Sequence, residues 1–193
     1  MSVRARAASV AAVLVALATA GCYRGSARSV SLDDVDRESG WVMVRGMRVI
    51  KQESAHDCGA AALAMILERW GIPDASAEIR RTMPAPAEQG LTAGRLRQFA
   101  RDKGLRAFVI SGAESDLVNE LQANRPVLVG LVQRYRLMGD KGLSHYEVMI
   151  GINQATGHVL LLDPGHGLRE DALASFDEEW RAAGRVTLVV APS

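Results

Sequence analysis

The chain has 193 residues, of which 48% are hydrophobic and only 5% aromatic, and its formal net charge is +1. This length and apolar content fit one soluble domain of helices and strands, with an additional segment at one end. Without residues 1–21 the chain has 21 basic and 22 acidic side chains. Such a nearly neutral body argues against nucleic acid as the main partner.

Residues 1–21 have the pattern of an export signal. Arg4 and Arg6 give a positive start, residues 10–20 are apolar, and small residues precede Cys22. The apolar run is too short to span a membrane as a helix. Because the cysteine directly follows small residues, the segment resembles a bacterial lipoprotein signal, in which Cys22 carries the lipid and begins the mature protein. We therefore expect an exported protein that is lipid-anchored to the membrane of the bacterial cell envelope. An ordinary secretory signal is the alternative.

Residues 22–40 are polar and carry charges of both signs, which predicts a flexible tether. The folded domain is then expected over residues 41–193, and residues 41–50 predict its first strand. The two cysteines of an exported protein, Cys22 and Cys58, suggest a disulfide. We do not favour that pairing, because lipid attachment explains Cys22 and a role as a nucleophile explains Cys58.

A cysteine at the start of a predicted helix is the central feature of the domain. Residues 58–70 are rich in strong helix formers, Gly71 and Pro73 follow as stop signals, and Asp57 occupies the N-cap position. A thiol in the first helical turn lies near free backbone N–H groups and the positive end of the helix dipole, which favour a thiolate. Cys58 is therefore a candidate nucleophile, and a small buried apolar residue is the alternative.

Gln52 precedes this cysteine by six residues, so a loop can bring its amide beside the thiol. Together with the Cys58 N–H group it could stabilise the oxyanion of a tetrahedral intermediate. Gln52, the sequence Asp57-Cys58-Gly59 and the following Ala/Leu/Met-rich helix resemble the bacteriocin-processing, or double-glycine, peptidases. That family is a branch of the papain-like cysteine peptidases.

Further helix and strand signals follow in chain order. Capping residues and Gly or Pro stops predict three helices, at residues 75–83, at residues 92–103 with Thr92 as cap, and at residues 115–123 with Ser115 as cap. Residues 105–110 predict a strand. Residues 127–132 form a continuous apolar run, which is typical of a central strand covered on both faces.

Two loops are expected between these elements. Residues 84–90 contain two prolines and predict a surface loop. Residues 134–143 are polar and glycine-rich, and they precede the next candidate site residue. They are either a flap over the substrate or, as we prefer, an ordinary solvated connection.

Residues 145–152 and 158–163 predict two strands joined by a turn. A hairpin centred on Gln154 places His145 opposite Asp163, with their Cβ atoms about 5 Å apart. A centre shifted by one residue makes them diagonal neighbours on the same face. Pro164 cannot continue a central strand, so Asp163 is expected at the strand end, near the rim of the sheet.

These two residues complete a catalytic set. A cysteine nucleophile needs an imidazole as base, and the imidazole needs an acceptor on its other nitrogen to fix its tautomer and orientation. The resemblance implies the same roles, because family members have a histidine that opens a hydrophobic strand and an Asp-Pro pair that ends the next one. His145 and Asp163-Pro164 match this pattern.

Other polar residues near these strands are weaker candidates. Glu147 shares a face with His145, either as an edge charge or as a rival partner for the imidazole. His56 precedes the cysteine and could touch substrate, and His158 opens a strand. A metal site formed by His145, Asp163 and His166 is conceivable, but no ligand spacing supports it. We expect neither a metal nor another cofactor.

The last elements are a helix that begins with a capping box at Ser175 and extends through Ala183, and a closing strand at residues 185–190. Phe176 and Trp180 lie four residues apart, so they share one face of this helix.

The expected fold is papain-like and α+β, with the Cys58 helix packed on an antiparallel sheet that carries His145 and Asp163. The resemblance covers residues 49–190 and implies cleavage of a peptide or protein substrate, after a Gly-Gly pair in a leader peptide. The best-known members are fused to a transporter and an ATPase. This sequence has no Gly-x-x-x-x-Gly-Lys phosphate loop, so we expect a stand-alone version that works with a separate export machine.

Two other functions use the same residues. An acyltransferase would accept an amine in place of water. A peptide-binding module of an export or assembly system would hold a peptide without cutting it, although it would not need Gln52, Cys58, His145 and Asp163 together.

Overall fold

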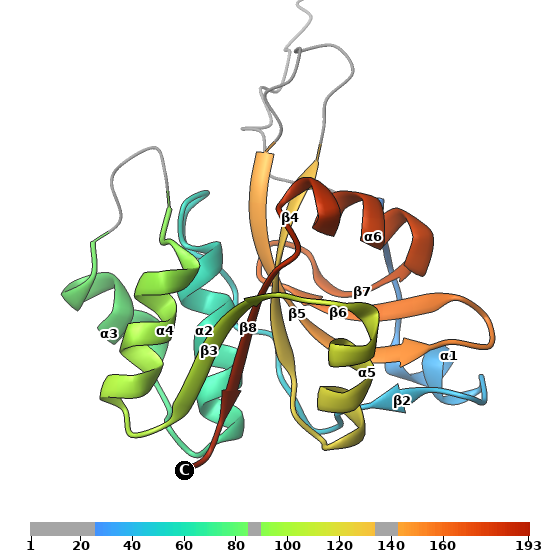
Figure 1. The fold of residues 1–193 in the computed structure, drawn as a ribbon, viewed down its shortest axis with the longest axis horizontal. Helices are drawn as coiled ribbons and strands as arrows, with labels where there is room; N and C mark the ends of the chain where they lie inside the picture. The colour runs from blue at the N-terminus through green and yellow to red at the C-terminus, as the bar shows by residue number, and fades with distance from the viewer. Residues whose placement is uncertain (1–25, 85–89, 134–142) are drawn as a thin grey trace, which may run out of the picture.

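The computed structural model describes residues 26–84, 90–133 and 143–193. Its described residues form an eight-stranded antiparallel sheet in the order β1-β7-β6-β5-β4-β8-β3, and β2 pairs with β5 outside this order (Figure 1). The strands are β1 (Arg28–Ser29), β2 (Val42–Met43), β3 (Arg106–Ser111), β4 (Val127–Gln133), β5 (Leu143–Asn153), β6 (His158–Asp163), β7 (Gly167–Ala172) and β8 (Val186–Ala191). The helices are α1 (Leu32–Asp36), α2 (Cys58–Arg69), α3 (Ala75–Thr82), α4 (Ala93–Asp102), α5 (Glu114–Gln122) and α6 (Leu173–Ala182).

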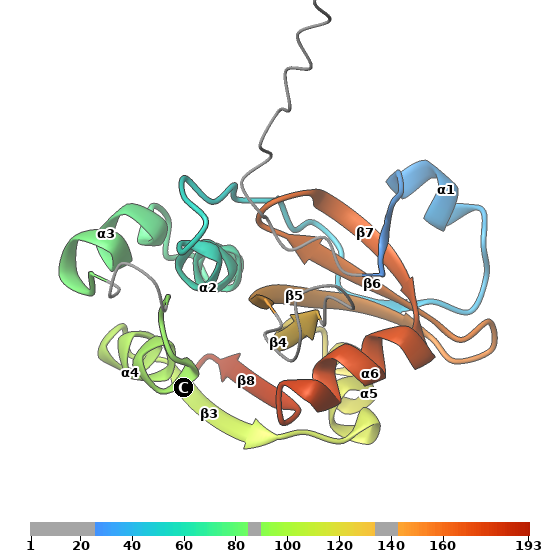
Figure 2. The same ribbon diagram turned by 90° about the horizontal axis from the view of Figure 1, so that it is seen from above.

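The helices cover both faces of the sheet. Helices α2, α3 and α4 form a group beside one face, and α5 and α6 lie on the other (Figure 2). Helix α2 packs against β5, and α6 packs against β4. This arrangement confirms the expected α+β fold, in which a helix that starts with Cys58 packs on an antiparallel sheet.

The central strand β4 links the two apolar clusters of the protein. Val127, Val129 and Leu131 belong to the cluster that contains the α6 side chains, whereas Leu128 belongs to the cluster around α2. Successive strand residues point to opposite faces, so one strand contributes to both clusters. The prediction of a central, doubly covered strand at residues 127–132 is confirmed.

Helix α2 is buried along most of its length. The ten residues from Cys58 to Leu67 are all buried, because the helix is apolar around its whole circumference rather than along one stripe. The helix ends before Gly71, which adopts a positive φ of 79°. Asp57 occupies the N-cap position, but among the described residues its side chain makes no capping hydrogen bond.

Two predicted helix starts were wrong. Helix α5 is capped at Ala113 rather than Ser115, and the Asp116 carboxylate accepts a hydrogen bond from the Ala113 N–H group at 2.8 Å. Helix α6 begins at Leu173, before the predicted capping box. The rings of Phe176 and Trp180 stack with their centroids 5.5 Å apart and are buried, as their spacing predicts.

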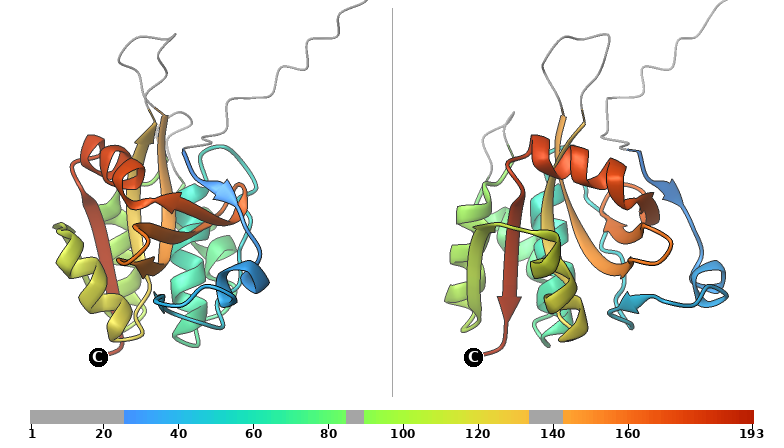
Figure 3. Two further views of the ribbon diagram at one scale, coloured as in Figure 1. Left: turned by 90° about the vertical axis from the view of Figure 1, so that its right-hand side faces the viewer. Right: turned by 45° about the vertical axis from the view of Figure 1, so that its right-hand side comes forward.

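The N-terminal part of the described chain is more ordered than a tether. Strand β1 pairs with β7, and helix α1 follows it (Figure 3). Val35 of this helix is only 3% exposed. The strand expected at residues 41–50 is limited to β2. The ordered structure therefore begins before residue 41, because this segment adds a strand to the edge of the sheet.

Strand β7 has no counterpart in the sequence-based expectations. Its central residues Arg169, Glu170 and Asp171 are charged but buried, which hides the alternation that normally reveals a strand. Their side chains find partners instead of water: Arg28 pairs with Glu170 at 2.7 Å, and Ser26 donates a hydrogen bond to Asp171.

Several predictions fall on residues outside the described ranges. These are the signal segment with Cys22, most of the loop at residues 84–90 and most of the loop at residues 134–143. Among the helices of the described residues, none is both long enough and apolar enough to cross a membrane.

Candidate active site

Cys58 lies at the first position of α2 and is 7% exposed. It is a free cysteine within the described part of the chain and belongs to neither apolar cluster. Its thiol instead hydrogen-bonds with the imidazole of His145 on β5. The start of α2 therefore places the sulfur against a polar partner, whereas the rest of the helix packs into the core.

His145 and Asp163 meet through a hairpin register that differs from the direct pairing. Val148 pairs with Leu162, and continuing this register places Glu147, rather than His145, opposite Asp163. His145 is therefore the diagonal neighbour of Asp163 on the same face, which is the shifted alternative. A register shift between Met149 and Gly151 moves the pairing back by one residue, and without it Val148 would lie opposite Asp163 and His145 would be on the other face. The His145 Nε2 atom still lies 2.8 Å from Asp163 Oδ1.

The environment of His145 favours its charged form. Burial by itself would lower the pKa, but the hydrogen bonds with Asp163 and with Cys58 outweigh it and raise the pKa of His145 to about 10. Because Nε2 faces Asp163, Nδ1 is the ring nitrogen available to the thiol. The arrangement suits an ion pair between a thiolate and an imidazolium.

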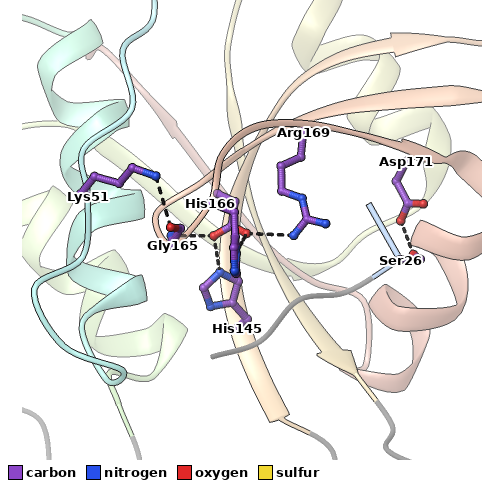
Figure 4. A network of polar contacts seen from close by, with 8 residues as sticks. Ser26, Lys51, His145, Gly165, His166, Arg169 and Asp171 are labelled. Carbon is purple, nitrogen blue, oxygen red and sulfur yellow. Dashed lines mark hydrogen bonds and ion pairs between the residues drawn. The ribbon is translucent and has the colours of Figure 1, made fainter. Parts of the chain in front are cut away.

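Asp163 ends β6 and accepts hydrogen bonds from four groups. Its Oδ1 atom contacts His145 and accepts from the Gly165 N–H group at 2.7 Å, while Oδ2 lies 2.6 Å from Nδ1 of His166 and 3.4 Å from Nη1 of Arg169. Figure 4 shows the side chains of His145, His166 and Arg169 converging. Burial alone would raise the pKa of Asp163, but the bond with His145 and the further donors hold it well below its usual range.

Gln52 lies beside the loop that follows Asp163. Its N–H group donates to the carbonyl oxygen of Pro164 at 3.1 Å, which fixes the approach to α2 against this loop. The side-chain Oε1 is buried and, among the described residues, accepts no hydrogen bond. A Cβ atom on Gly165 would lie 3.2 Å from Asp163 Oδ1 and 3.8 Å from that Oε1 atom, so the amide and the carboxylate approach the same glycine.

Glu147 is not an edge charge, because it is only 1% exposed. Burial and the negative charge of Asp163 raise the pKa of Glu147, and the opposing effects of His145 and Arg169 do not cancel this shift. Within the described part of the chain its Oε2 atom has no hydrogen-bond partner. Glu147 is therefore a buried acid beside the candidate catalytic pair, in a setting that favours its protonated form.

A metal ion would find a different ligand set from the one that the sequence suggested. Ligand atoms of His145, Glu147 and Asp163 lie within 4.8 Å of one another, whereas His166 is not part of this group. Both carboxylate oxygens of Asp163 already accept hydrogen bonds from two donors each. A cation here would have to compete with these donors.

Tyr146 sets the distance between α2 and the sheet. A Cβ atom on Gly59 would lie 3.2 Å from the Tyr146 ring and 3.3 Å from Leu96. The glycine after the cysteine therefore allows a close approach that a larger residue would prevent. Sequence reasoning identified this glycine as part of a motif without this physical role.

Of the remaining histidines, one lies at the site and two lie at or near the surface. His158 contacts Thr156 at 3.2 Å and Glu170 at 3.7 Å, and His56 is exposed. His166, expected only as a conceivable metal ligand, is in contact with Asp163, and so is Arg169, to which no sequence motif pointed. The sequence Gly165-His166-Gly167, directly after Asp163-Pro164, is the signal that could have identified the first of these.

Comparison with known proteins finds one matching family model and two curated relatives. The model of the Peptidase C39 family matches residues 47–193. The transport/processing ATP-binding protein ComA of Streptococcus pneumoniae, from strains R6 and TIGR4, is 29% identical over 137 residues, which cover 71% of this chain. The chain spans 18% of the length of these curated relatives.

Solved structures share the fold. The peptidase domain of Streptococcus ComA, a bi-functional ABC transporter involved in quorum sensing, matches with a TM-score of 0.62 and 23% identity, over 77% of this chain and all of that domain. A putative C39-like peptidase from Bacillus anthracis matches with a TM-score of 0.63 and 18% identity, over 79% of this chain and 98% of that one. A double glycine motif protease from an AMS/PCAT transporter, solved with its leader peptide, has a TM-score of 0.57 and 21% identity, covering 78% and 97%.

Proposed function

The chain belongs to the Peptidase C39 family and is a cysteine peptidase, and we propose that it cuts an exported or leader-type peptide with Cys58 as its nucleophile. The observation that carries the proposal is the contact of one imidazole with two groups. His145 bonds with the Cys58 thiol and, at 2.8 Å, with the Asp163 carboxylate. This pairing supports the roles of nucleophile, base and orienting acid.

The reaction begins with the Cys58 proton on His145. The thiolate attacks the carbonyl carbon of the peptide, and the carbonyl oxygen becomes an oxyanion. The His145 imidazolium then gives its proton to the leaving amine, and the C–N bond breaks to leave a thioester. A water molecule, deprotonated by His145, attacks the thioester and releases the acyl group, and the sulfur leaves as the thiolate.

Asp163 and Gln52 have supporting roles in this reaction. Asp163 holds the Nε2 side of the ring, so that Nδ1 faces the sulfur, and it stabilises the imidazolium. The backbone N–H of Cys58 and the side-chain amide of Gln52 are the proposed donors to the oxyanion. The position of Gln52 supports this assignment, because its backbone bonds with Pro164 and its buried Oε1 atom lies near Gly165, in the loop that follows Asp163.

Gly-Gly specificity is the finer part of the proposal. Its support comes from relatives, one of which is named as a double glycine motif protease and was solved with a leader peptide. The test is cleavage of matched synthetic leader peptides that end in Gly-Gly, Gly-Ala or Leu-Ala before the cut, followed by mass spectrometry. We expect cleavage of the Gly-Gly peptide alone, and equal rates for all three would reject the specificity.

A thiol-directed activity probe tests the nucleophile and separates the candidate functions. We expect labelling at Cys58, no labelling in Cys58→Ala, and much slower labelling in His145→Ala. A peptide-binding module would bind leader peptide without cutting it and would show no His145-dependent labelling. An acyltransferase would form an amide with an added amine in preference to the free acid.

We also propose that the protein is exported and anchored through a lipid on Cys22, and that it works beside a separate export machine. The support is the sequence at residues 1–22 and the transporter relatives. Metabolic labelling with a fatty acid in the bacterial cell should mark the wild-type protein and spare a Cys22→Ser variant. Labelling that persists in this variant would contradict the anchor.

A further inference from the structure

The geometry points to His166 as a positioning residue for catalysis: we infer that its imidazole holds one oxygen of Asp163, so that the other oxygen faces His145. The inference deepens the proposed function and depends on it. Two imidazoles approach the same carboxylate from different sides. Nε2 of His145 lies 2.8 Å from Oδ1, and Nδ1 of His166 lies 2.6 Å from Oδ2.

The charge of Asp163 decides which atom carries the proton in its contact with His166. Asp163 is ionised because its donors hold its pKa well below the usual range. An ionised carboxylate only accepts hydrogen bonds, so the Nδ1 atom of His166 must carry a proton and donate it. Rotation of the carboxylate would weaken this bond and the bond with His145 together. His166 therefore resists the rotation that would misdirect the base.

Arg169 cannot replace His166 in this role. Its Nη1 atom is 3.4 Å from Oδ2, which is long for an N–H···O bond, whereas the imidazole is at 2.6 Å. Arg169 supplies positive charge close to Oδ2, and His166 supplies the short directional bond. The two residues therefore contribute differently to the position of Asp163.

The loop that carries His166 is held in place by the segment that leads to the nucleophile. Lys51 Nζ donates to the carbonyl oxygen of Gly165 at 3.2 Å, and the next residue, Gln52, donates its N–H group to Pro164. Figure 4 shows Lys51 reaching Gly165 beside His166. The loop is thus fixed on the side of the proposed oxyanion donor, and the imidazole extends this rigidity to the carboxylate.

Partial exposure makes His166 suitable for substitution. Its side chain is 28% exposed, compared with 5% for His145 and none for Asp163. A change at this position should therefore leave the core packing intact. His158, at the other end of β6 and 36% exposed, offers a matched control outside the site.

The experiment compares His166→Leu, His166→Asn and the control His158→Leu, with kcat and KM measured across pH on a leader peptide. We expect His166→Leu to lower kcat about tenfold, the effect of losing one hydrogen bond to a charged group, with little change in KM. The acid limb of the profile should move to higher pH, because Asp163 loses a donor that lowers its pKa. Asparagine should restore most of the rate, since its amide nitrogen is also bonded to Cγ. His158→Leu should match the wild type.

The outcomes separate this inference from the function on which it rests. A wild-type protein that neither cuts peptides nor labels at Cys58 would reject the proposed function. An active wild type with an unchanged rate and pH profile in His166→Leu would overturn the positioning role. An equal loss in His166→Asn and His166→Leu would also overturn it, because the hydrogen bond would then not explain the effect.

Discussion

Asp163 shows how much of a candidate site can depend on one carboxylate. It is fully buried, and it meets four donors from β5, β7 and the loop between β6 and β7. A buried charge is costly unless such partners compensate it. The partners also hold the carboxylate in one orientation. His145 needs this, because its imidazole can act as a base only when it is correctly oriented.

Removing the charge of Asp163 should affect activity more than structure. In Asp163→Asn an amide replaces the carboxylate, so His145 meets a group that can favour the wrong tautomer and does not stabilise the imidazolium. We expect kcat to fall by at least about 100-fold. Steady-state cleavage of a leader peptide measures the loss, and circular dichroism checks the fold. A loss below threefold in a folded variant would contradict the role of Asp163.

Glu147 should make the protein less stable as the pH rises. Its pKa is raised in the folded state, so above the ordinary value of 4.5 the unfolded chain releases a proton that the folded protein keeps. This contribution to the free energy of unfolding is complete below that pH and is lost progressively above it. Glu147→Gln should flatten the dependence, as measured by urea unfolding from pH 5 to pH 8. An unchanged slope would show that Glu147 is ionised in the folded protein.

At the scale of elements, the contact between α2 and β5 brings the nucleophile to the sheet. Tyr146 follows His145 directly and packs against Gly59, which follows Cys58 directly. Cys58 and His145 are therefore each next in sequence to one of the two residues that form this tight contact. A small shift in this contact would change the distance between the thiol and the imidazole.

Gly59→Ala should test this contact. The added methyl would lie 3.2 Å from the Tyr146 ring, so helix and strand must separate, at a cost of about 1–3 kcal/mol. Gly94→Ala on α4 is the control, because its Cβ meets only an ordinary contact at 3.9 Å. That change should stabilise the protein by about 0.5–1 kcal/mol, as alanine is the better helix former. Urea unfolding and peptide cleavage measure both variants, and equal behaviour would rule out the proposed contact.

At the scale of the whole molecule, the N-terminal segment completes the sheet. Strand β1 extends the sheet beyond β7, which carries Arg169 of the carboxylate network, and Arg28 pairs with Glu170 of the same strand. Residues 26–40 would be dispensable if they were only a tether. In this fold they are part of the structure that supports the site.

Shortening the chain should reveal this support. A variant that starts at Trp41 loses β1, α1 and the burial of Val35, whereas one that starts at Ser26 keeps them. We expect the first to lose about 2 kcal/mol of unfolding free energy relative to the second, roughly the value of one buried aliphatic side chain. Urea midpoints of the two variants measure the difference. Identical midpoints would mean that residues 26–40 do not stabilise the domain.

The sequence alone determined the features that arise between near neighbours. Helix α2 with Cys58 at its start, the central strand β4 and the β5–β6 hairpin follow from propensity, apolar periodicity and turn residues within short stretches. Glycine, proline and the capping residue Thr92 marked several boundaries correctly for the same reason. Cys58, His145 and Asp163 were predicted as candidate site residues because each stood at the start or the end of an element expected from the sequence, although β5 begins at Leu143, two residues before His145.

Only the tertiary structure decided how these elements meet. The register shift near Met149, the burial of Glu147, the strand formed by charged residues in β7 and the contact of His166 with Asp163 depend on packing between separate segments. Local propensity does not record which side chain will lie opposite another. The free energy of such contacts comes from burial and hydrogen bonds that exist only once the sheet and its two helical layers have assembled.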